Sequence, residues 1–189
     1  NFDSSHVMPV AMVKKLFSSV ILSPTSFNIQ HWRFVRIRDA ELRKQIHPLA
    51  MDQIQVLEAS ELLAITADVQ AWQKHPERYW RNADTETRKI LVDLLLDFYR
   101  GREWMQRDEA IRSGAFAAQN LMLAAKAMGY DSCPMIGFDQ EGVARLINLP
   151  EDHVIVMLLA IGKAIAPAQP RGGQIEVSEI LITDRFPKT

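Results

Sequence analysis

The sequence predicts an α+β fold. Two continuous apolar runs, Glu61–Ala67 and Val154–Ile161, have the length of strands and suit strands that are buried on both faces. Helical patterns lie before, between and after them, without the regular alternation of strand and helix that is typical of α/β proteins. The 189 residues suffice for one full-sized core, and no repeat or clear boundary divides them. We therefore expect residues 1–189 to form a single domain.

The first 60 residues predict a helix, a strand and two short helices. In the first helix, apolar residues recur at spacings of three and four and fall on one face. They are Val13, Leu16, Phe17, Val20 and Ile21. A strand is expected over Trp32–Ile37. Asp39 can cap a helix over Ala40–Ile46, which Pro48 ends, and a further short helix is expected over Asp52–Ala59.

Residues 70–105 differ in character from the rest, and we interpret them as an excursion over the core that forms a lid. They hold three of the four tryptophans among many charged residues. Asp84 is predicted to cap a helix that Gly101 closes. The apolar stripe of this helix comprises Ile90, Leu91, Leu94, Leu95 and Phe98. The aromatic residues Trp72, Tyr79, Trp80 and Trp104 either fill the core or line the substrate side of a site.

The strongest helix pattern in the chain is Asp108–Met128. Its second half has few polar residues, so apolar side chains cover nearly the whole circumference. A helix that is apolar all round must be buried on all sides. Two interpretations remain open: a second subunit covers one face of this helix in a dimer, or the helix lies at the centre of a monomeric core.

The last third of the chain predicts two further strands beside the apolar run at 154–161. Cys133–Phe138 is expected to be a short strand and turn, followed by a helix from its cap Asp139 through Ile147. A loop rich in Pro, Ala and Gly follows at 164–173. Ile175–Ile182 alternates well enough to predict a last strand, at a sheet edge or reaching a neighbouring chain.

Composition and charge exclude several classes of protein. The formal net charge is −1 and the basic residues are scattered, which argues against partners such as nucleic acid or an anionic membrane. A single cysteine, Cys133, excludes an internal disulfide and fits a reducing, cytoplasmic environment. No apolar run reaches the length of a membrane span, and no signal peptide opens the chain. Because the sequence begins at Asn1 rather than Met, we expect natural residues before it.

The chain lacks the motifs of catalysis by side chains alone. Its five histidines show no metal-binding spacing with one another or with Cys133. We interpret the Cys133 side chain as an inert part of the packed core. No nucleophile elbow, dinucleotide fingerprint or P-loop is present. If the protein is an enzyme, a cofactor then supplies the reactive atoms. No residue is assigned a catalytic role, and no metal ligand is expected.

The segment Ser23–Phe34 is the most informative stretch. It joins a helix to a strand through a polar loop that contains Thr25, Ser26 and Asn28, pinned by apolar residues at its exit. Such a loop can present hydrogen-bonding groups to a flat polar ligand. Equally, its side chains can satisfy only their own backbone, as in many connections.

This stretch, Ser-Pro-Thr-Ser-Phe-Asn-Ile-Gln-His-Trp-Arg-Phe, resembles the Pro-Ser-Ser-x-Asn-x-Gln-Pro-Trp loop of the nitroreductase family, whose members are reductases dependent on flavin mononucleotide (FMN). A second segment, Gly129–Asp139, is similar to the flavin-edge segment of that family, and nearly all of the chain can be matched. The resemblance implies a mixed central β-sheet wrapped by helices, in an intertwined homodimer with FMN at the subunit interface. It also implies that Pro24, Thr25, Ser26 and Asn28 reach the flavin of the partner subunit.

The resemblance assigns the other flavin contacts to three places. The backbone of Pro134, Met135, Ile136 and Gly137 would face the ring, with the Ile136 N–H near N5. Asp52 and Gln55 would lie at the pyrimidine edge, where the neutral Gln55 stabilises the anionic reduced flavin less than a lysine would. Arg171 would bind the phosphate, with Lys163 a weaker match. The family also uses arginines just before the position of Phe2, and these are missing from this sequence.

These expectations favour an FMN-dependent oxidoreductase that uses NADH or NADPH to reduce nitro compounds, quinones or related small-molecule acceptors by ping-pong hydride transfer. The sequence selects neither the coenzyme nor the physiological acceptor. The alternative is a non-catalytic module that binds flavin or a protein partner through the tryptophans of the lid.

Overall fold

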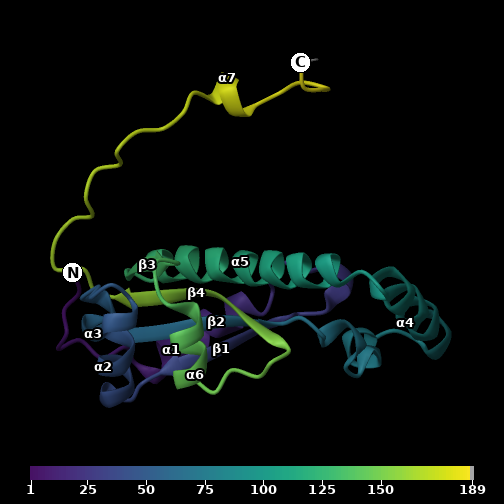
Figure 1. Ribbon diagram of the computed structural model, residues 1–189, viewed down its shortest axis with the longest axis horizontal. Coiled ribbons are helices and arrows are strands. Elements are labelled where there is room, and N and C mark those ends of the chain that lie inside the picture. The colour runs from purple at the N-terminus through teal and green to yellow at the C-terminus, as the bar shows by residue number, and fades with distance from the viewer. Residues whose placement is uncertain (188–189) are drawn as a thin grey trace.

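A computed structural model describes residues 1–187 and has one four-stranded β-sheet at its centre (Figure 1). The strands are β1 (Trp32–Ile37), β2 (Glu61–Asp68), β3 (Asp131–Met135) and β4 (His153–Gly162). They lie in the order β1-β2-β4-β3, so the two apolar strands are central and β1 and β3 form the edges. All eight residues of β2 are buried.

Helices cover both faces of the sheet, and alternate residues of the central strands face each layer. On one face lie α1 (Val10–Val20) and α5 (Glu103–Ala127), whose apolar residues pack with Leu63 and Leu159. On the other face lie α2 (Ala40–Leu49), α3 (Gln55–Glu58) and α6 (Gln140–Leu146), which pack with Leu62 and Leu158. Figure 1 shows α5 along one face and α2, α3 and α6 on the other. The α+β class and the sheet wrapped by helices are confirmed.

The lid segment extends beyond the end of the sheet, where Figure 1 shows α4 (Thr85–Tyr99) apart from the main body. Two 3-10 turns, Ala71–Gln73 and Pro76–Trp80, precede α4 and pack with it around Ile29, Trp72, Leu95 and Tyr99. Asp84 caps α4, as expected, by accepting a hydrogen bond from the Thr87 N–H. The predicted stripe is only partly buried, because Ile90 and Leu94 are 53% and 55% exposed. One face of the lid helix is therefore uncovered in the single chain.

Several local expectations need correction. Every strand pairing within residues 1–187 is antiparallel, so the sheet of one chain is not mixed. Pro48 lies inside the last turn of α2 rather than beyond it, and the helix predicted over 52–59 shortens to the single turn of α3. The predicted last strand at 175–182 is wrong, because the segment contains the short helix α7 (Val177–Ile180) and pairs with no strand.

The chain after β4 forms an extended arm. Figure 1 shows it leaving the sheet near the N-terminus and running away from the body through α7. Residues 164–187 are exposed throughout, including the large apolar side chains of Ile175, Leu181 and Phe186. The arm adds no strand to its own sheet because it runs away from the open edge at β3 (Figure 1). None of the described helices has the length and apolar character needed to span a bilayer.

Candidate functional site

Two of the segments singled out in the sequence meet in the structure. The Gln53 Nε2 atom donates to the Gly137 carbonyl at 3.3 Å and to the Ala50 carbonyl at 3.1 Å. The Met51 sulfur lies 3.7 Å from the place that a Cβ on Gly137 would take. The loop before α3, which carries Asp52, is thereby joined to the turn after β3. The neighbours of Asp52 in the chain therefore contact Gly137, whereas the Asp52 carboxylate lies 3.5 Å from His47 and Gln55 lines a cavity together with Cys133.

The turn after β3 presents its backbone at an open edge of the sheet. Met135 is 4% exposed and anchors the turn in the core, whereas Ile136 is 71% exposed. Because β3 is an edge strand, backbone groups that do not face β4 are open on its far side. An open N–H beside a glycine is the arrangement that allows a flat ring to approach main chain closely.

A cavity of about 810 Å³ lies beside the first residues of β3, and its lining does not include residues 134–137. That volume is in the range of sites that enclose a cofactor or a drug-sized ligand. Gln55, Cys133 and the start of the C-terminal arm line it, together with Lys126 and Asp131, which form an ion pair at 2.6 Å. Lys126 is the lysine of the cavity lining, and the sequence analysis did not single it out because it lies on α5, three residues before the second motif begins.

Cys133 lines the same cavity without the properties of a nucleophile. Its side chain packs against the core cluster on the α2 face. Burial raises the pKa of its thiol, which lowers the share of reactive thiolate at neutral pH. The interpretation of Cys133 as packing therefore fits its surroundings.

The predicted phosphate ligand Arg171 is not at this cavity. It lies on the exposed arm and does not line the cavity, which the arm borders only over residues 164–169. Lys163 is also engaged elsewhere, because its Nζ donates to the Gly129 carbonyl at 2.5 Å and lies over the Tyr130 ring. Within one chain, neither residue joins the other predicted contacts.

The opening loop is bound to its own chain by a polar network. The hydroxyls of Thr25 and Ser113 are 2.9 Å apart, and the Ser113 hydroxyl donates to the Glu109 carboxylate at 3.1 Å. The Ser26 N–H donates to the same carboxylate at 3.2 Å. Glu109 and Ser113 are buried on α5, and they fix the loop against that helix. The Thr25 side chain and the Ser26 backbone are thus bound within their own chain, to residues of α5 as well as to the loop itself.

Pro24 and Asn28 are more open. Both residues are exposed, and the Asn28 side chain uses one N–H to donate to the Tyr79 carbonyl of the lid at 2.8 Å. The side-chain oxygen of Asn28 accepts a hydrogen bond from the Gln30 side chain. The hydrogen bond to Tyr79 ties the loop to the lid, while the rest of Asn28 stays exposed.

The opening loop and the 134–137 turn do not meet within one chain. The loop leads into β1, whereas the turn follows β3, and these strands are the two opposite edges of the sheet. Three spacings of about 4.8 Å between neighbouring strands put the edges roughly 14 Å apart. A flat ligand that touches both segments therefore requires them to come from two different chains.

Backbone strain gathers in both segments. Residues 1–187 contain eight non-glycine residues with positive φ. Five of them lie in the two candidate regions: Phe27, Asn28, Gln30, Met51 and Asp52. Such conformations cost of order 1–3 kcal/mol each and persist where the surrounding structure requires them, often at ligand sites. The strain thus marks the same segments as the sequence motifs do.

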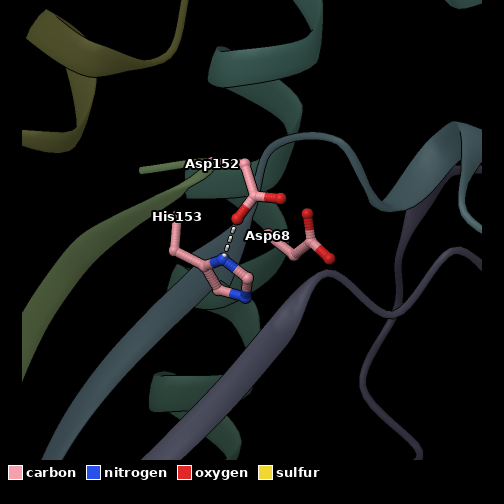
Figure 2. A group of neighbouring side chains, drawn as sticks. All are labelled: Asp68, Asp152 and His153. Carbon is pink, nitrogen blue, oxygen red and sulfur yellow. Dashed lines mark hydrogen bonds and ion pairs between the residues drawn. The ribbon is translucent and has the colours of Figure 1, made fainter. Parts of the chain in front are cut away.

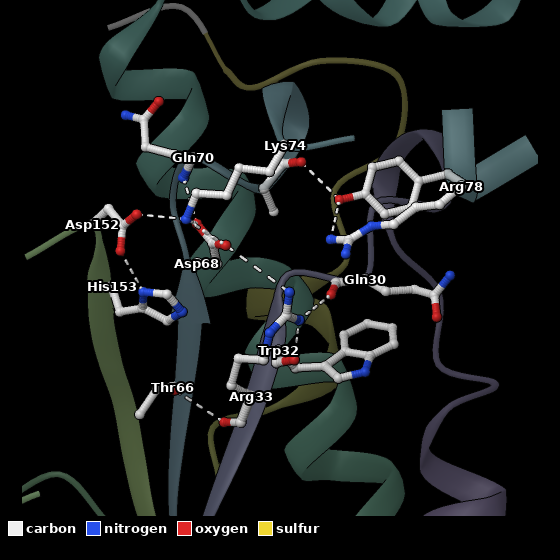
Figure 3. A network of polar contacts seen from close by, with 12 residues as sticks. Gln30, Trp32, Arg33, Thr66, Asp68, Gln70, Lys74, Arg78, Asp152 and His153 are labelled. Atoms are coloured by element: carbon white, nitrogen blue, oxygen red, sulfur yellow. Dashed lines mark hydrogen bonds and ion pairs between the residues drawn. The ribbon is translucent and has the colours of Figure 1, made fainter. Parts of the chain in front are cut away.

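A third polar cluster lies at the end of β2 and the start of β4. The side chains of Asp68, Asp152 and His153 come together there, with ligand atoms all within 4.8 Å of one another (Figure 2). No sequence pattern predicts this group, because 84 residues separate its two aspartates. Lys74 already provides the cation, since its Nζ lies 2.9 Å from both Asp68 carboxylate oxygens and 2.5 Å from Asp152 (Figure 3). Hydrogen bonds from Lys74 and His153 hold the pKa of Asp152 below its ordinary value.

This cluster is therefore an ion-pair network that ties the lid to the sheet. Lys74 belongs to the first part of the lid, whereas Asp68 is the last residue of β2 and Asp152 directly precedes β4. Asp68 is 3% exposed and would be costly to bury without its partner.

Comparison with known proteins agrees with this architecture. The chain matches the model of the nitroreductase family over residues 1–163. Protein DrgA of Synechocystis sp. is 50% identical over 186 residues, which cover 96% of this chain and 89% of DrgA. The oxygen-insensitive NADPH nitroreductase of Helicobacter pylori (strain 26695) is 27% identical over 189 residues, or 95% of this chain and 89% of that enzyme.

Solved structures support the same relationship. A structure from Exiguobacterium sibiricum in complex with FMN has a TM-score of 0.89 at 27% identity, and the match covers 96% of this chain and 90% of that one. The family model spans the sheet, both helical layers and the lid. On this evidence the chain belongs to the nitroreductase family.

Proposed function

We propose that the protein is a homodimeric, FMN-dependent oxidoreductase that uses NADH or NADPH to reduce nitro compounds, quinones or related small molecules in a ping-pong reaction. The observation that carries this proposal is the contact between Gln53 and Gly137, with the 810 Å³ cavity that Gln55 and Cys133 line. In a chain of this family, the contact brings the open backbone at 136–137 to the 51–55 segment, and the cavity has the neutral, hydrogen-bonding side chain of Gln55 in its lining.

The residues at the cavity fit FMN. The backbone of Ile136 and Gly137 would face the ring, and Gln55, with Asp52 beside it, would serve the pyrimidine edge. Lys126 would reach the phosphate from the same chain only by giving up its ion pair with Asp131, and Arg171 would join it only through movement of the arm or from a partner. Pro24, Thr25, Ser26 and Asn28 would contact the flavin of the other subunit, with Thr25 and Ser26 acting through backbone or spare lone pairs.

FMN, when bound, supplies the centre that accepts a hydride from the coenzyme and passes it to the acceptor. The chain holds the ring, sets its electrostatics and leaves one face open to substrates. Gln55 can donate a hydrogen bond but carries no charge, so it favours an anionic edge less than a lysine would. No side chain is required as a general acid, since water can protonate the acceptor.

The dimer is supported by two uncovered apolar surfaces. Along α5, Trp104, Phe116 and Leu123 are 65%, 44% and 59% exposed, and Phe116 and Leu123 are seven residues apart and share one face. The arm adds further exposed apolar residues after 164. Exposed large apolar side chains that gather in this way are typical of an interface. Pairing through α5 would cover one surface, and the arm of each chain would lie on its neighbour. We also propose that the whole chain acts as one domain in the cytoplasm, with neither nucleic acid nor membrane as a partner.

The test begins with the visible spectrum of the purified protein. A yellow protein that bleaches with NADH or NADPH and is reoxidised by a nitroaromatic compound supports the enzyme. A colourless protein that takes up no added FMN refutes it and favours a non-catalytic interaction module. Sedimentation at micromolar concentration should show a dimer, and a monomer at all concentrations would remove the two-chain site.

A further inference from the structure

A second cavity, of about 690 Å³, lies between the exit of the opening loop and the turn that precedes α4. It has no residue in common with the cavity beside β3. Its lining comes from two short stretches of chain. The lining residues are Asn28, Ile29, Gln30, Arg33, Arg78, Tyr79, Trp80, Arg81, Asn82 and Ala83.

The charge of this lining is entirely positive. Arg33, Arg78 and Arg81 contribute three guanidinium groups, and the lining contains no aspartate or glutamate. Arg78 lies over the Tyr79 ring and donates to its hydroxyl at 2.9 Å. Within residues 1–187, the Arg81 guanidinium forms neither an ion pair nor a hydrogen bond. Three cations without an acid partner in the lining form a site for an anion.

One acid lies close to this cavity, although it does not line it. Asp68 is 4.0 Å from Arg33 and shares the single cation of Lys74 with Asp152, so Arg33 is partly compensated. Figure 3 shows Asp68 joined to both Lys74 and Arg33, whereas Arg78 is joined to neither aspartate. Arg33 is held in place by donating to the Gln30 and Trp32 carbonyls, and its side chain is 42% exposed. Its position is thus fixed, and the charges of the lining without an acid partner are those of Arg78 and Arg81.

The neutral part of the lining suits a flat, polar ligand. Asn28, Gln30 and Asn82 provide amide groups, and Tyr79 and Trp80 provide aromatic surface. The Trp80 Nε1 atom is buried without a hydrogen-bond partner within the described chain. Guanidinium groups beside aromatic surface match a phosphate attached to an aromatic base, because arginine binds phosphate oxygens through two parallel hydrogen bonds.

We propose that this cavity is an anion subsite that binds the phosphate groups of the pyridine nucleotide coenzyme. The inference rests on the proposed function, which puts the loop carrying Asn28 beside the flavin of the partner subunit. Asn28 lines the cavity, so a dinucleotide held there would extend from the cavity toward that flavin. A volume of about 690 Å³ accommodates a phosphorylated nucleoside, which is larger than a simple nitroarene.

The test compares Arg81→Gln and Arg78→Gln with Arg145→Gln, a control on the exposed surface of α6. Steady-state KM is measured for NADPH and NADH, and also for 4-nitrobenzoate and nitrobenzene as acceptors that differ in one carboxylate. Each cavity variant is expected to raise the KM for NADPH about tenfold, which corresponds to 1.4 kcal/mol. The acceptor KM values and the control should change less than twofold. Arg81→Lys should recover only part of the loss, because lysine keeps the charge without the planar fork.

The pattern across substrates identifies the bound group. A rise in KM confined to NADPH assigns the cavity to the 2′-phosphate, and an equal rise in KM for NADH assigns it to the pyrophosphate. Both results support the proposal. A loss confined to 4-nitrobenzoate overturns the assignment to the coenzyme, and KM values equal to those of the control overturn the subsite itself.

A binding measurement separates this proposal from the proposed function. Isothermal titration of 2′,5′-ADP into the protein requires no turnover and no flavin reduction. Binding that Arg81→Gln weakens about tenfold supports the anion subsite even if the protein lacks reductase activity. Absence of binding to an active, FMN-loaded enzyme refutes the subsite and leaves the proposed function intact.

Discussion

His31 makes the stability of the protein depend on pH in a defined direction. Its side chain is fully buried beneath the opening loop, with Nδ1 3.2 Å from the Ser113 hydroxyl and 3.4 Å from the Thr25 hydroxyl. Burial lowers the pKa of His31 from 6.5 to about 4, against the opposing effect of the Glu109 and Asp68 carboxylates. Between these two pH values the unfolded chain takes up a proton that the folded chain does not. The free energy of unfolding therefore falls as the pH is lowered from 6.5 to 4, and this contribution levels off below pH 4.

The size of the effect follows from the separation of the two pKa values. At 1.36 kcal/mol for each pH unit, neutral burial of His31 is expected to cost the protein about 3 kcal/mol of stability between pH 7.5 and pH 4. Replacement by glutamine removes the titrating group. The difference in unfolding free energy between the wild-type protein and His31→Gln should thus change by about 3 kcal/mol across this range, whatever its value at pH 7.5.

The assay is urea denaturation followed by tryptophan fluorescence at several pH values, at one fixed protomer concentration because a dimer is expected. His75→Gln, the same change at an exposed histidine outside the network, is the matched control. Parallel pH profiles for the wild-type protein and His31→Gln, within about 0.5 kcal/mol, would show that His31 accepts a proton without loss of the fold. That result would refute the assigned burial of a neutral imidazole.

Three further changes test the packing, the lid and the cofactor site. Gly114→Ala puts a Cβ 2.6 Å from a Val156 methyl. Urea denaturation should therefore show a loss of about 1–3 kcal/mol in the free energy of unfolding, even though alanine favours helix. Adding Val156→Ala should restore most of that free energy. Lys74→Met leaves the buried Asp68 without its cation, so the unfolding free energy should fall by roughly 1.5–3 kcal/mol. Gln55→Lys adds a positive charge at the proposed pyrimidine edge, and spectroelectrochemistry should show the midpoint potential of bound FMN rising by about 20–30 mV for a gain near 1 kcal/mol.

Each of these changes has an outcome that would contradict its premise. A Gly114→Ala protein as stable as wild type would mean that α5 and β4 are not in close contact at this point. Unchanged stability in Lys74→Met, with Lys89→Met on the surface of α4 as the control, would mean that the ion-pair network does not form. An unmoved midpoint potential in Gln55→Lys would place Gln55 away from the flavin edge.

Local patterns in the sequence were enough to predict most of the elements. The bounds of β1 were predicted to the residue, and the apolar runs at 61–67 and 154–161 became the central strands β2 and β4. The caps Asp39 and Asp139 were also predicted, and each accepts a backbone hydrogen bond from the first turn of its helix. These features depend on interactions within a few residues, so neighbouring sequence is sufficient to specify them.

The failures occur where a segment depends on what covers it. Ile175–Ile182 has the alternation of a strand, but a strand needs a free edge, and the arm leaves the body without reaching one. The stripe on α4 predicted burial, yet in one chain Ile90 and Leu94 face outward. The sequence shows that these residues are apolar, but the surface against which they pack is set by the tertiary or quaternary structure.

For the site, the sequence alone determined the segments and their chemical character: a polar opening loop, a turn ending at Gly137, and a family resemblance that the comparisons confirm. Only the tertiary structure decided which segments meet. It joined Gln53 to Gly137, separated the opening loop from that turn across the sheet, and gathered Arg33 with Arg78 and Arg81 around a cavity. The physical reason is that side-chain type is written residue by residue, whereas proximity depends on strand order and register, which the whole chain sets at once.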